Sequence, residues 1–296
     1  MVAAFAVAGA GCAGADEPAA TSTPTPISTA TAPPPPATAS PAGTVSGANA
    51  YIGSIAVDPG GGTVMLGTGL GLFRLKKGAK DAERVTGRLT TPNGIGPVSS
   101  NLVVRYAGPG DLLASGHPEG GSLPENLGLM RSRDAGNTWA PVVEVGESDY
   151  HILQVTGQDI VGVRADEAKI RVSDDGGRTF EERTPPGAPL DVAFDPADAK
   201  RMVVTTQQGV FSSGDDGGSW RERDTTPATQ LAWGKTLYRA DPGGAIKVSA
   251  DGGATWKDAG TIGMDTTELA VDAGGALYAS VAGGEVRRST DGGAHW

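Results

Sequence analysis

The octapeptide Ser132-Arg133-Asp134-Ala135-Gly136-Asn137-Thr138-Trp139 decides the fold of this chain, because the sequence repeats it. The unit, Ser-x-Asp-x-Gly-x-Thr-Trp with small variations, recurs at residues 173–180, 213–220, 249–256 and 289–296. Its terminal aromatic residue returns after 41, 40, 36 and then 40 residues. Five copies at so regular a spacing predict an array of similar structural units packed side by side.

Each copy stands in the same local context. Runs of strand-forming residues precede it, as at Arg201–Thr206 and Thr236–Tyr238, and a third run such as Ala245–Ser249 leads into the Ser. A short run follows the aromatic residue, as at Arg221–Arg223. Four short strands in about forty residues, joined by turns rich in Gly and Asp, predict the blade of an all-β propeller.

The stretch 51–98 has the same layout of short β-rich runs, but its hairpin at 76–82 has lost the motif. Counting it as a blade predicts a six-bladed propeller in residues 47–296, with seven blades as the alternative count. The last copy ends at Trp296, before an outer strand. Either residues 44–50 supply that strand and close the ring, or the C-terminus is clipped.

The residues of the repeat have physical roles in a tight turn. The Ser hydroxyl and Asp carboxylate are expected to accept backbone N–H groups, the Gly permits a positive φ, and the aromatic ring folds back over the hairpin. Calcium binding at Asp174-Asp175-Gly176 is not favoured, because the turn lacks a distal acidic ligand. We therefore interpret the following residues as structural: Asp134, Asp175, Asp215, Asp251, Asp291, Trp139, Phe180, Trp220, Trp256 and Trp296. These copies resemble the Asp-box (BNR) repeats of sialidases and related propellers, and the resemblance covers residues 51–296.

The N-terminus predicts export. Residues 1–11 are apolar and small, and the only cysteine follows in Gly9-Ala10-Gly11-Cys12. This run resembles a bacterial lipobox, which implies a signal remnant at 1–12 and lipidation of Cys12. The alternative is a cleaved secretory peptide with an incidental Cys. Both interpretations place the protein outside the cytoplasm, and the first attaches it to the cell membrane facing outward.

A tether follows the signal segment. Residues 13–46 are almost entirely Ala, Thr, Pro, Ser and Gly, including the run Pro33–Pro36. So few apolar side chains cannot offset the entropy of ordering the chain, so we expect a disordered spacer.

Composition excludes several classes of function. The net charge is −10, from 24 Lys and Arg against 34 Asp and Glu, which argues against nucleic-acid binding. One cysteine permits neither an intrachain disulfide nor a Cys-based zinc site. No apolar run reaches eighteen residues, so membrane contact is expected through a lipid anchor alone. We expect a monomer without a cofactor.

Ligand-binding residues are expected on one face of the propeller. This face carries the loops that join the second and third strands and those that enter each innermost strand. The longest such loop, 115–127, presents His117, Glu119 and Glu125. Residues 147–151 present Asp149 and His151. Arg164 and Arg239, each followed two residues later by an Asp, occupy corresponding loops.

These residues admit competing interpretations. His117 and His151, from neighbouring blades with acidic neighbours, are candidates for binding a metal or for proton transfer, although two His are an incomplete ligand set. The alternative is that they hydrogen-bond loop backbone. Arg164 and Arg239 are candidates for a carboxylate clamp, because guanidinium binds carboxylate in a bidentate way, or they are ordinary surface residues.

A closer resemblance is to actinobacterial lipoproteins that carry a glycosyl-hydrolase or exo-sialidase name. The features shared with them are Ile55-Ala56-Val57-Asp58-Pro59, Gly71-Leu72-Phe73-Arg74, Ser115-Gly116-His117-Pro118 and Tyr150-His151. One departure is that the group tends to open its first strand with His-x-His, where this chain has Tyr51-Ile52-Gly53.

Likeness to true sialidases implies three Arg around a sugar carboxylate, a Tyr nucleophile with a Glu partner, and an acidic acid/base. The early Arg motif is altered here, since Phe73-Arg74-Leu75 is followed by Lys76 where the family has Pro. Tyr238 and Tyr278 are candidate nucleophiles, with Glu268 or Glu285 as partners. Glu119 and Asp149 are further catalytic candidates, and no spacing singles out one set.

We therefore favour a sialidase-like binding module at the cell envelope, which recognises a glycan or an envelope protein. The alternative is a catalytically active exo-glycosidase. A second alternative is a metal-binding propeller, or one resembling the photosystem II assembly factor, although that relative typically has a basic patch. Two carboxyl groups about 5–10 Å apart over the channel, with Arg alongside, would favour the enzyme.

Overall fold

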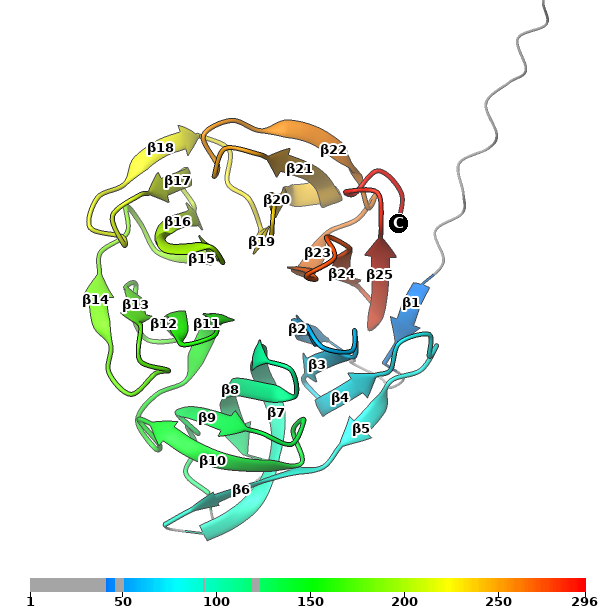
Figure 1. Cartoon of the computed structure of the whole chain (residues 1–296), viewed down its shortest axis with the longest axis vertical. Coiled ribbons are helices and arrows are strands. Elements are labelled where there is room, and N and C mark those ends of the chain that lie inside the picture. Colours follow the sequence, from blue (N-terminus) through cyan, green and yellow to red (C-terminus); the bar gives the residue numbers. More distant parts are fainter. Residues whose placement is uncertain (1–40, 46–50, 93, 119–122) are drawn as a thin grey trace, which may run out of the picture. The chain divides into compact units, whose positions relative to one another are not determined.

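The computed structural model describes residues 41–45, 51–92, 94–118 and 123–296, all within one compact unit, Ala37–Trp296. The described residues form six sheets in a ring around a central axis, the channel axis of a propeller, which confirms an all-β propeller (Figure 1). The one helical element in these ranges is a 3₁₀ turn, η1 (Pro242–Gly244). Within them, no helix is long and apolar enough to cross a membrane.

Four of the sheets are complete antiparallel blades in which the chain runs from the channel outward. The first contains β2 (Ile52–Val57), β3 (Val64–Thr68), β4 (Gly71–Leu75) and β5 (Glu83–Val85). The third contains β11 (Tyr150–Thr156), β12 (Asp159–Arg164), β13 (Ile170–Ser173) and β14 (Glu181–Arg183). The fourth contains β15 (Pro189–Asp195), β16 (Asp198–Thr206), β17 (Gly209–Ser213) and β18 (Arg221–Asp224). The fifth contains β19 (Gln230–Trp233), β20 (Leu237–Ala240), β21 (Ala245–Ser249) and β22 (Lys257–Thr261).

The last blade joins the two ends of the propeller. Its strands β23 (Thr266–Val271), β24 (Leu277–Val281) and β25 (Glu285–Ser289) are completed on the outside by β1 (Pro41–Thr44). Thr44 also bonds to the first blade, since its N–H donates to the carbonyl of Lys80 at 2.9 Å. The ring is therefore closed by an N-terminal strand that lies inside the stretch expected to be tether.

The second sheet departs from the regular blade. It contains β6 (Gly87–Thr91), β7 (Gly94–Gly108), β8 (Asp111–Pro118), β9 (Leu129–Ser132) and β10 (Thr138–Val143). The sheet closes on itself, because β10 pairs antiparallel with β9 and parallel with β6. The expectation of six equivalent blades is thus corrected to five four-stranded blades and one five-stranded sheet. The physical reason is the length of β7, whose 15 residues pair first with β6 and then with β8.

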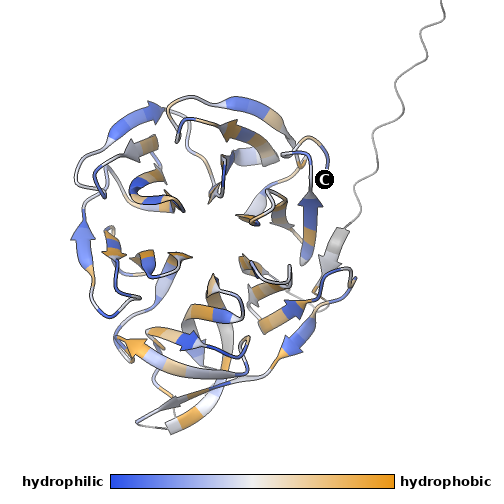
Figure 2. Ribbon diagram, in the orientation of Figure 1, coloured by the Kyte–Doolittle hydropathy of each residue, from blue (hydrophilic) through white to orange (hydrophobic). Residues whose placement is uncertain are grey.

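The core lies between neighbouring blades. Second strands such as β3 and β24 are buried at every residue, because a blade packs against each of their faces. One interblade cluster joins Tyr238 and Ile246 of the fifth blade to Leu269 and Leu277 of the last. Figure 2 shows the contrast with the outer strands, where β14 and β18 are hydrophilic.

The repeated motifs join the third and fourth strands of the third, fourth and fifth blades, as predicted, whereas the first copy joins β9 to β10 and the last copy follows β25. In the first, Ser132 Oγ accepts the N–H of Gly136 at 2.8 Å, and Asp134 Oδ1 accepts that of Thr138 at 2.8 Å. The Gly has a φ of 88°, and the indole N–H of Trp139 donates to its carbonyl at 2.9 Å. These bonds explain why the motif keeps its spacing.

The fifth copy replaces Thr with His without losing the turn. Thr138 donates its hydroxyl to Asp134 Oδ2 at 2.7 Å. In the last copy, His295 Nδ1 lies 2.6 Å from Asp291 Oδ2 and makes the equivalent contact. His295 is exposed and belongs to the turn rather than to a site on the loop face.

Candidate functional site

Two of the predicted histidines meet at one predicted carboxylate on the loop face. Asp149 Oδ2 lies 3.1 Å from His117 Nε2 and 2.8 Å from His151 Nε2. Asp149 is buried, while the side chains of His117 and His151 are 31% and 65% exposed. The other ring nitrogen of His117, Nδ1, lies 2.9 Å from the carbonyl oxygen of Glu125. The structure thus connects the second and third sheets through an acidic side chain held by two imidazoles.

The local fold explains why Asp149 is buried. It immediately precedes β11, and the next residue, Tyr150, is fully buried. The Tyr150 N–H donates to Ser115 Oγ at 3.0 Å and its hydroxyl donates to Glu144 Oε2 at 3.1 Å. Burial, followed by the nearby Glu144 carboxylate, raises the pKa of Tyr150. Tyr150 therefore anchors the strand that carries Asp149 and His151.

The His117–Asp149–His151 cluster does not have the form of a metal centre. Within the ranges that the structure describes, no three His, Cys, Asp or Glu side chains form a group that could hold a metal ion. Both imidazole Nε2 atoms lie within hydrogen-bond distance of one carboxylate oxygen. The arrangement can hold loops together or exchange a proton at the surface.

The two predicted clamp arginines do not meet. Arg164 lies at the end of β12 and pairs with Asp166 at 3.4 Å and Glu167 at 3.3 Å. The other, Arg239, lies inside β20 rather than in a loop, and its side chain has no exposed surface.

Arg239 can be buried inside the blade because two carboxylates compensate its charge. Its NH2 and Nε atoms lie 2.8 Å from carboxylate oxygens of Asp224 and Asp241, respectively. Its guanidinium also covers the Trp256 ring at 4.9 Å. The expectation that Arg239 contacts an external ligand is corrected accordingly, since nothing outside the fold can reach it.

The predicted Tyr–Glu pairs are not formed. Tyr238 and Tyr278 are both buried, and the hydroxyl of Tyr278 accepts a hydrogen bond from Arg288 Nε at 3.0 Å. Glu285 pairs with Arg287 at 2.7 Å, while Glu268 faces the channel and pairs with Arg105. Two further predicted residues, Glu119 and Cys12, lie outside the described residues.

A cavity of about 740 Å³ opens at the other end of the channel. It is lined by residues at the ends of all six innermost strands and in the turns that follow them. At β11, for example, the cavity includes Gln154–Gly157, whereas His151 lies at the opposite end of that strand. Apolar and aromatic side chains dominate its wall, among them Val57, Tyr106, Phe194, Trp233 and Val271.

A charged cluster adjoins this cavity, whose lining includes two of its members, Arg105 and Gln154. Arg105 NH2 lies 2.6 Å from Glu268 Oε1, and Arg105 Nε donates to Gln154 Oε1 at 3.4 Å. Nearby, Asp191 accepts the N–H groups of Val192 at 2.8 Å and Leu231 at 2.7 Å. One guanidinium and two carboxyl groups therefore lie together in the channel, contributed by three different blades.

Burial dominates the electrostatics of the two acids. It raises the pKa of Asp191 to about 7, with a further rise from the Glu268 charge, against the lowering effect of the Leu231 N–H and Arg105. Burial also raises the pKa of Glu268, although Arg105 opposes this. Near neutral pH the cluster can thus hold a proton that ordinary carboxylates would have lost.

Sequence reasoning missed Arg105, Gln154 and Asp191 as channel residues. A signal was present, because Arg105 follows Leu102-Val103-Val104 directly and Asp191 stands between Leu190 and Val192. A charged residue inside an apolar strand needs a buried partner. The strand pattern alone does not reveal that the partner belongs to another blade.

Comparison with solved structures agrees with the propeller architecture. The chain is similar to an ancestral GH74 enzyme, with a TM-score of 0.53 and 13% identity over 83% of this chain and 37% of that chain. It is also similar to the WD40 repeats of RRP9, with a TM-score of 0.53 and 10% identity over 83% and 96% of the two chains. A third similar structure, YCF48 from Cyanidioschyzon merolae, has a TM-score of 0.49 and 14% identity over 84% of each chain.

These comparisons define the class of protein but no particular family. At identities of 10–13%, the first two neighbours establish a β-propeller fold and nothing about chemistry. The chain spans 37% of the GH74 enzyme. No family model and no curated protein matches the sequence. Membership of the Asp-box lipoprotein group stays a prediction from the motifs.

Proposed function

We propose that this protein is an exported binding propeller, anchored at the cell envelope through Cys12, which takes its ligand at the mouth of the central channel. The observation that carries the proposal is the 740 Å³ cavity, to which all six sheets contribute residues. Its size is within the range of ligand pockets. Its position differs from the loop face favoured by the sequence, because the cavity lies at the opposite ends of the same strands.

The wall favours a protein segment over a glycan. Val57, Pro196 and Val271 present apolar surface, and Arg201 lies over the Trp233 ring at 5.7 Å, so that ring is partly covered. Sugar recognition needs open aromatic faces and many hydrogen-bonding groups, whereas an apolar side chain from a protein segment needs a cavity of this kind. The preferred ligand is accordingly an envelope protein with an exposed apolar residue.

Filling the cavity tests this proposal. The full chain would be screened by fluorescence polarisation against labelled peptides with a central apolar residue, in parallel with a glycan array. Ala107→Trp places a large ring at the mouth and should weaken peptide binding at least tenfold. Ala168→Trp, at an exposed loop position, is the matched control and should bind like the parent. Equal binding by both variants, or glycan binding without peptide binding, would contradict the proposal.

The alternative function, an exo-glycosidase, draws support from one observation. Asp191 and Glu268 lie in the channel with Arg105 alongside, and both acids have raised pKa values, as a general acid requires. Hydrolysis of a panel of fluorogenic exo-glycosides, sialosides included, tests this alternative. Turnover abolished by Glu268→Gln in a folded protein would establish the enzyme, and a complete lack of turnover would remove it.

A further inference from the structure

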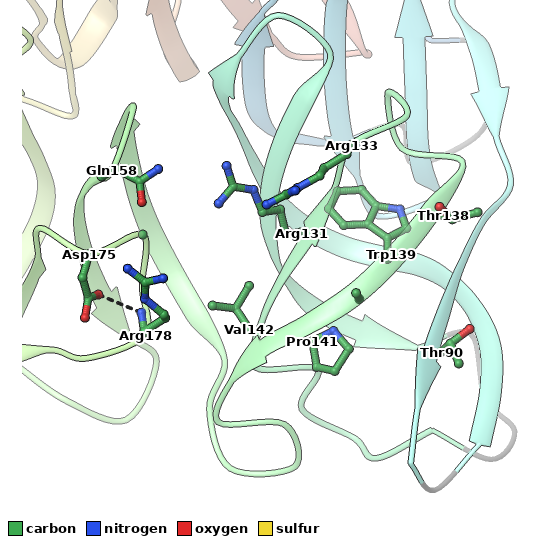
Figure 3. A pocket seen from close by; sticks show the side chains of 12 residues that line it. Thr90, Arg131, Arg133, Thr138, Trp139, Pro141, Val142, Gln158, Asp175 and Arg178 are labelled. Carbon is green, nitrogen blue, oxygen red and sulfur yellow. Dashed lines mark hydrogen bonds between the residues drawn. The ribbon is translucent and has the colours of Figure 1, made fainter.

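A second cavity lies between the second and third sheets, away from the channel mouth. Its volume is about 850 Å³ and its wall combines Thr138–Val142 of β10 with Gln158 and the Asp175–Arg178 hairpin (Figure 3). Three arginines also line it: Arg131, Arg133 and Arg178. Neither function considered above uses this cavity.

Arg131 is held in a fixed orientation. Its Nε and NH2 atoms lie 2.8 and 2.5 Å from the two carboxylate oxygens of Asp111. This bidentate pair compensates its charge and leaves NH1 directed across the sheet boundary. A Cβ added to Gly176 of the neighbouring blade would lie 3.7 Å from that NH1.

The other two arginines lack such compensation. Arg133 and Arg178 are exposed, and in the described part of the chain neither guanidinium has a carboxylate partner. The Asp175 carboxylate, which also lines the cavity, accepts the Thr179 hydroxyl at 2.7 Å and the Ser173 hydroxyl at 2.8 Å. Figure 3 shows Arg133 and Arg178 on opposite sides of the cavity, with Gln158 beside Arg178.

We infer that this cavity is a binding site for a phosphate group. Guanidinium groups on opposite walls suit a tetrahedral dianion, because its oxygens point in several directions. A carboxylate presents both of its oxygens in one plane, which suits a single arginine. Gln158 can donate a further hydrogen bond from its amide.

The cavity has room for more than a free ion. Pro141 and Val142 extend the wall away from the arginines and give an apolar surface to whatever carries the phosphate. A small phosphomonoester therefore fits the site as well as inorganic phosphate does. Inorganic phosphate and a phosphomonoester would bind the arginines through the same phosphate oxygens. They differ in whether contact with the apolar wall adds affinity.

Calorimetric titration of the full chain tests the inference with inorganic phosphate, glucose 6-phosphate and acetate as probes, at pH 7.5 and low salt. The double variant Arg133→Gln/Arg178→Gln should weaken phosphate binding at least tenfold. The matched control Arg221→Gln, an exposed arginine on β18, should change it less than twofold. Circular dichroism establishes that each variant is folded.

The outcomes are distinct. Tighter binding of glucose 6-phosphate than of phosphate supports the site with a phosphomonoester as its ligand, and equal binding supports it with free phosphate. Acetate binding as tight as phosphate, equal losses in the double variant and the control, or no phosphate binding at 10 mM would each overturn the inference. None of these results depends on whether the channel mouth binds a peptide.

Discussion

The buried Asp191 carboxyl should make the stability of the propeller depend on pH in an unusual direction. Its pKa is raised from 3.8 to about 7, because the side chain is buried and faces the Glu268 charge. Between about pH 4 and pH 7, the folded protein keeps a proton that the unfolded chain has lost. The free energy of unfolding therefore falls as the pH rises through this window, by up to about 1.4 kcal/mol per pH unit and about 4 kcal/mol in total.

Urea unfolding of the full chain, followed by Trp fluorescence at pH 5, 6, 7 and 8, measures this effect. Asp191→Asn removes the titrating carboxyl group. Because the amide has one oxygen, it can accept the N–H of Val192 or of Leu231 but not both, and the free energy of unfolding should fall by about 1–3 kcal/mol at pH 5. The gap between the parent and this variant should then shrink or reverse by pH 8. The control Asp258→Asn, whose side chain is 92% exposed, should run parallel to the parent.

One result would refute this reasoning. If the unfolding free energies of the parent and Asp191→Asn keep a constant difference from pH 5 to pH 8, the Asp191 pKa is not raised in the fold. The raised pKa of Glu268 acts in the same direction, so a residual decline in the variant is expected and does not count against Asp191.

Other predictions concern the scaffold. Hydrogen bonds from the Thr255 hydroxyl and backbone N–H lower the pKa of Asp251 to about 2. Its contribution to the stability of the fold is therefore present above about pH 4 and is lost as the pH falls through 2. Asp251→Ala should lower the Tm by about 2–4 °C at pH 7, where Asp258→Ala should leave calorimetric scans unchanged. Gly67→Ala should cost about 3 kcal/mol or prevent folding, because a Cβ there overlaps the backbone of the neighbouring sheet. Gly108→Ala meets nothing within 4 Å and should unfold in urea like the parent. Gly43→Val should shift the urea midpoint downward, because its side chain meets Leu75 and displaces the closing strand.

The repeats were readable because their interactions are local. Each motif satisfies its own turn within eight residues, as Ser132 and Asp134 do, so the spacing of Ser, Asp, Gly and the aromatic residue records the hydrogen bonds directly. The meeting of His117 with His151 could also be anticipated, because both follow from assigning loops to one face. The prediction that placed Arg239 in a loop was wrong by a few residues, because this residue lies inside β20.

The sequence by itself determined that the chain is a propeller and where its hairpins lie, since those depend on contacts a few residues apart. Only the tertiary structure decided how the ring closes, why β7 is shared between two partners, and which buried charges meet in the channel. Arg105 and Glu268 are 163 residues apart in the chain, and no local pattern specifies such a pair. Their contact depends on the arrangement of whole blades around one axis, so it emerges only when the ring is complete.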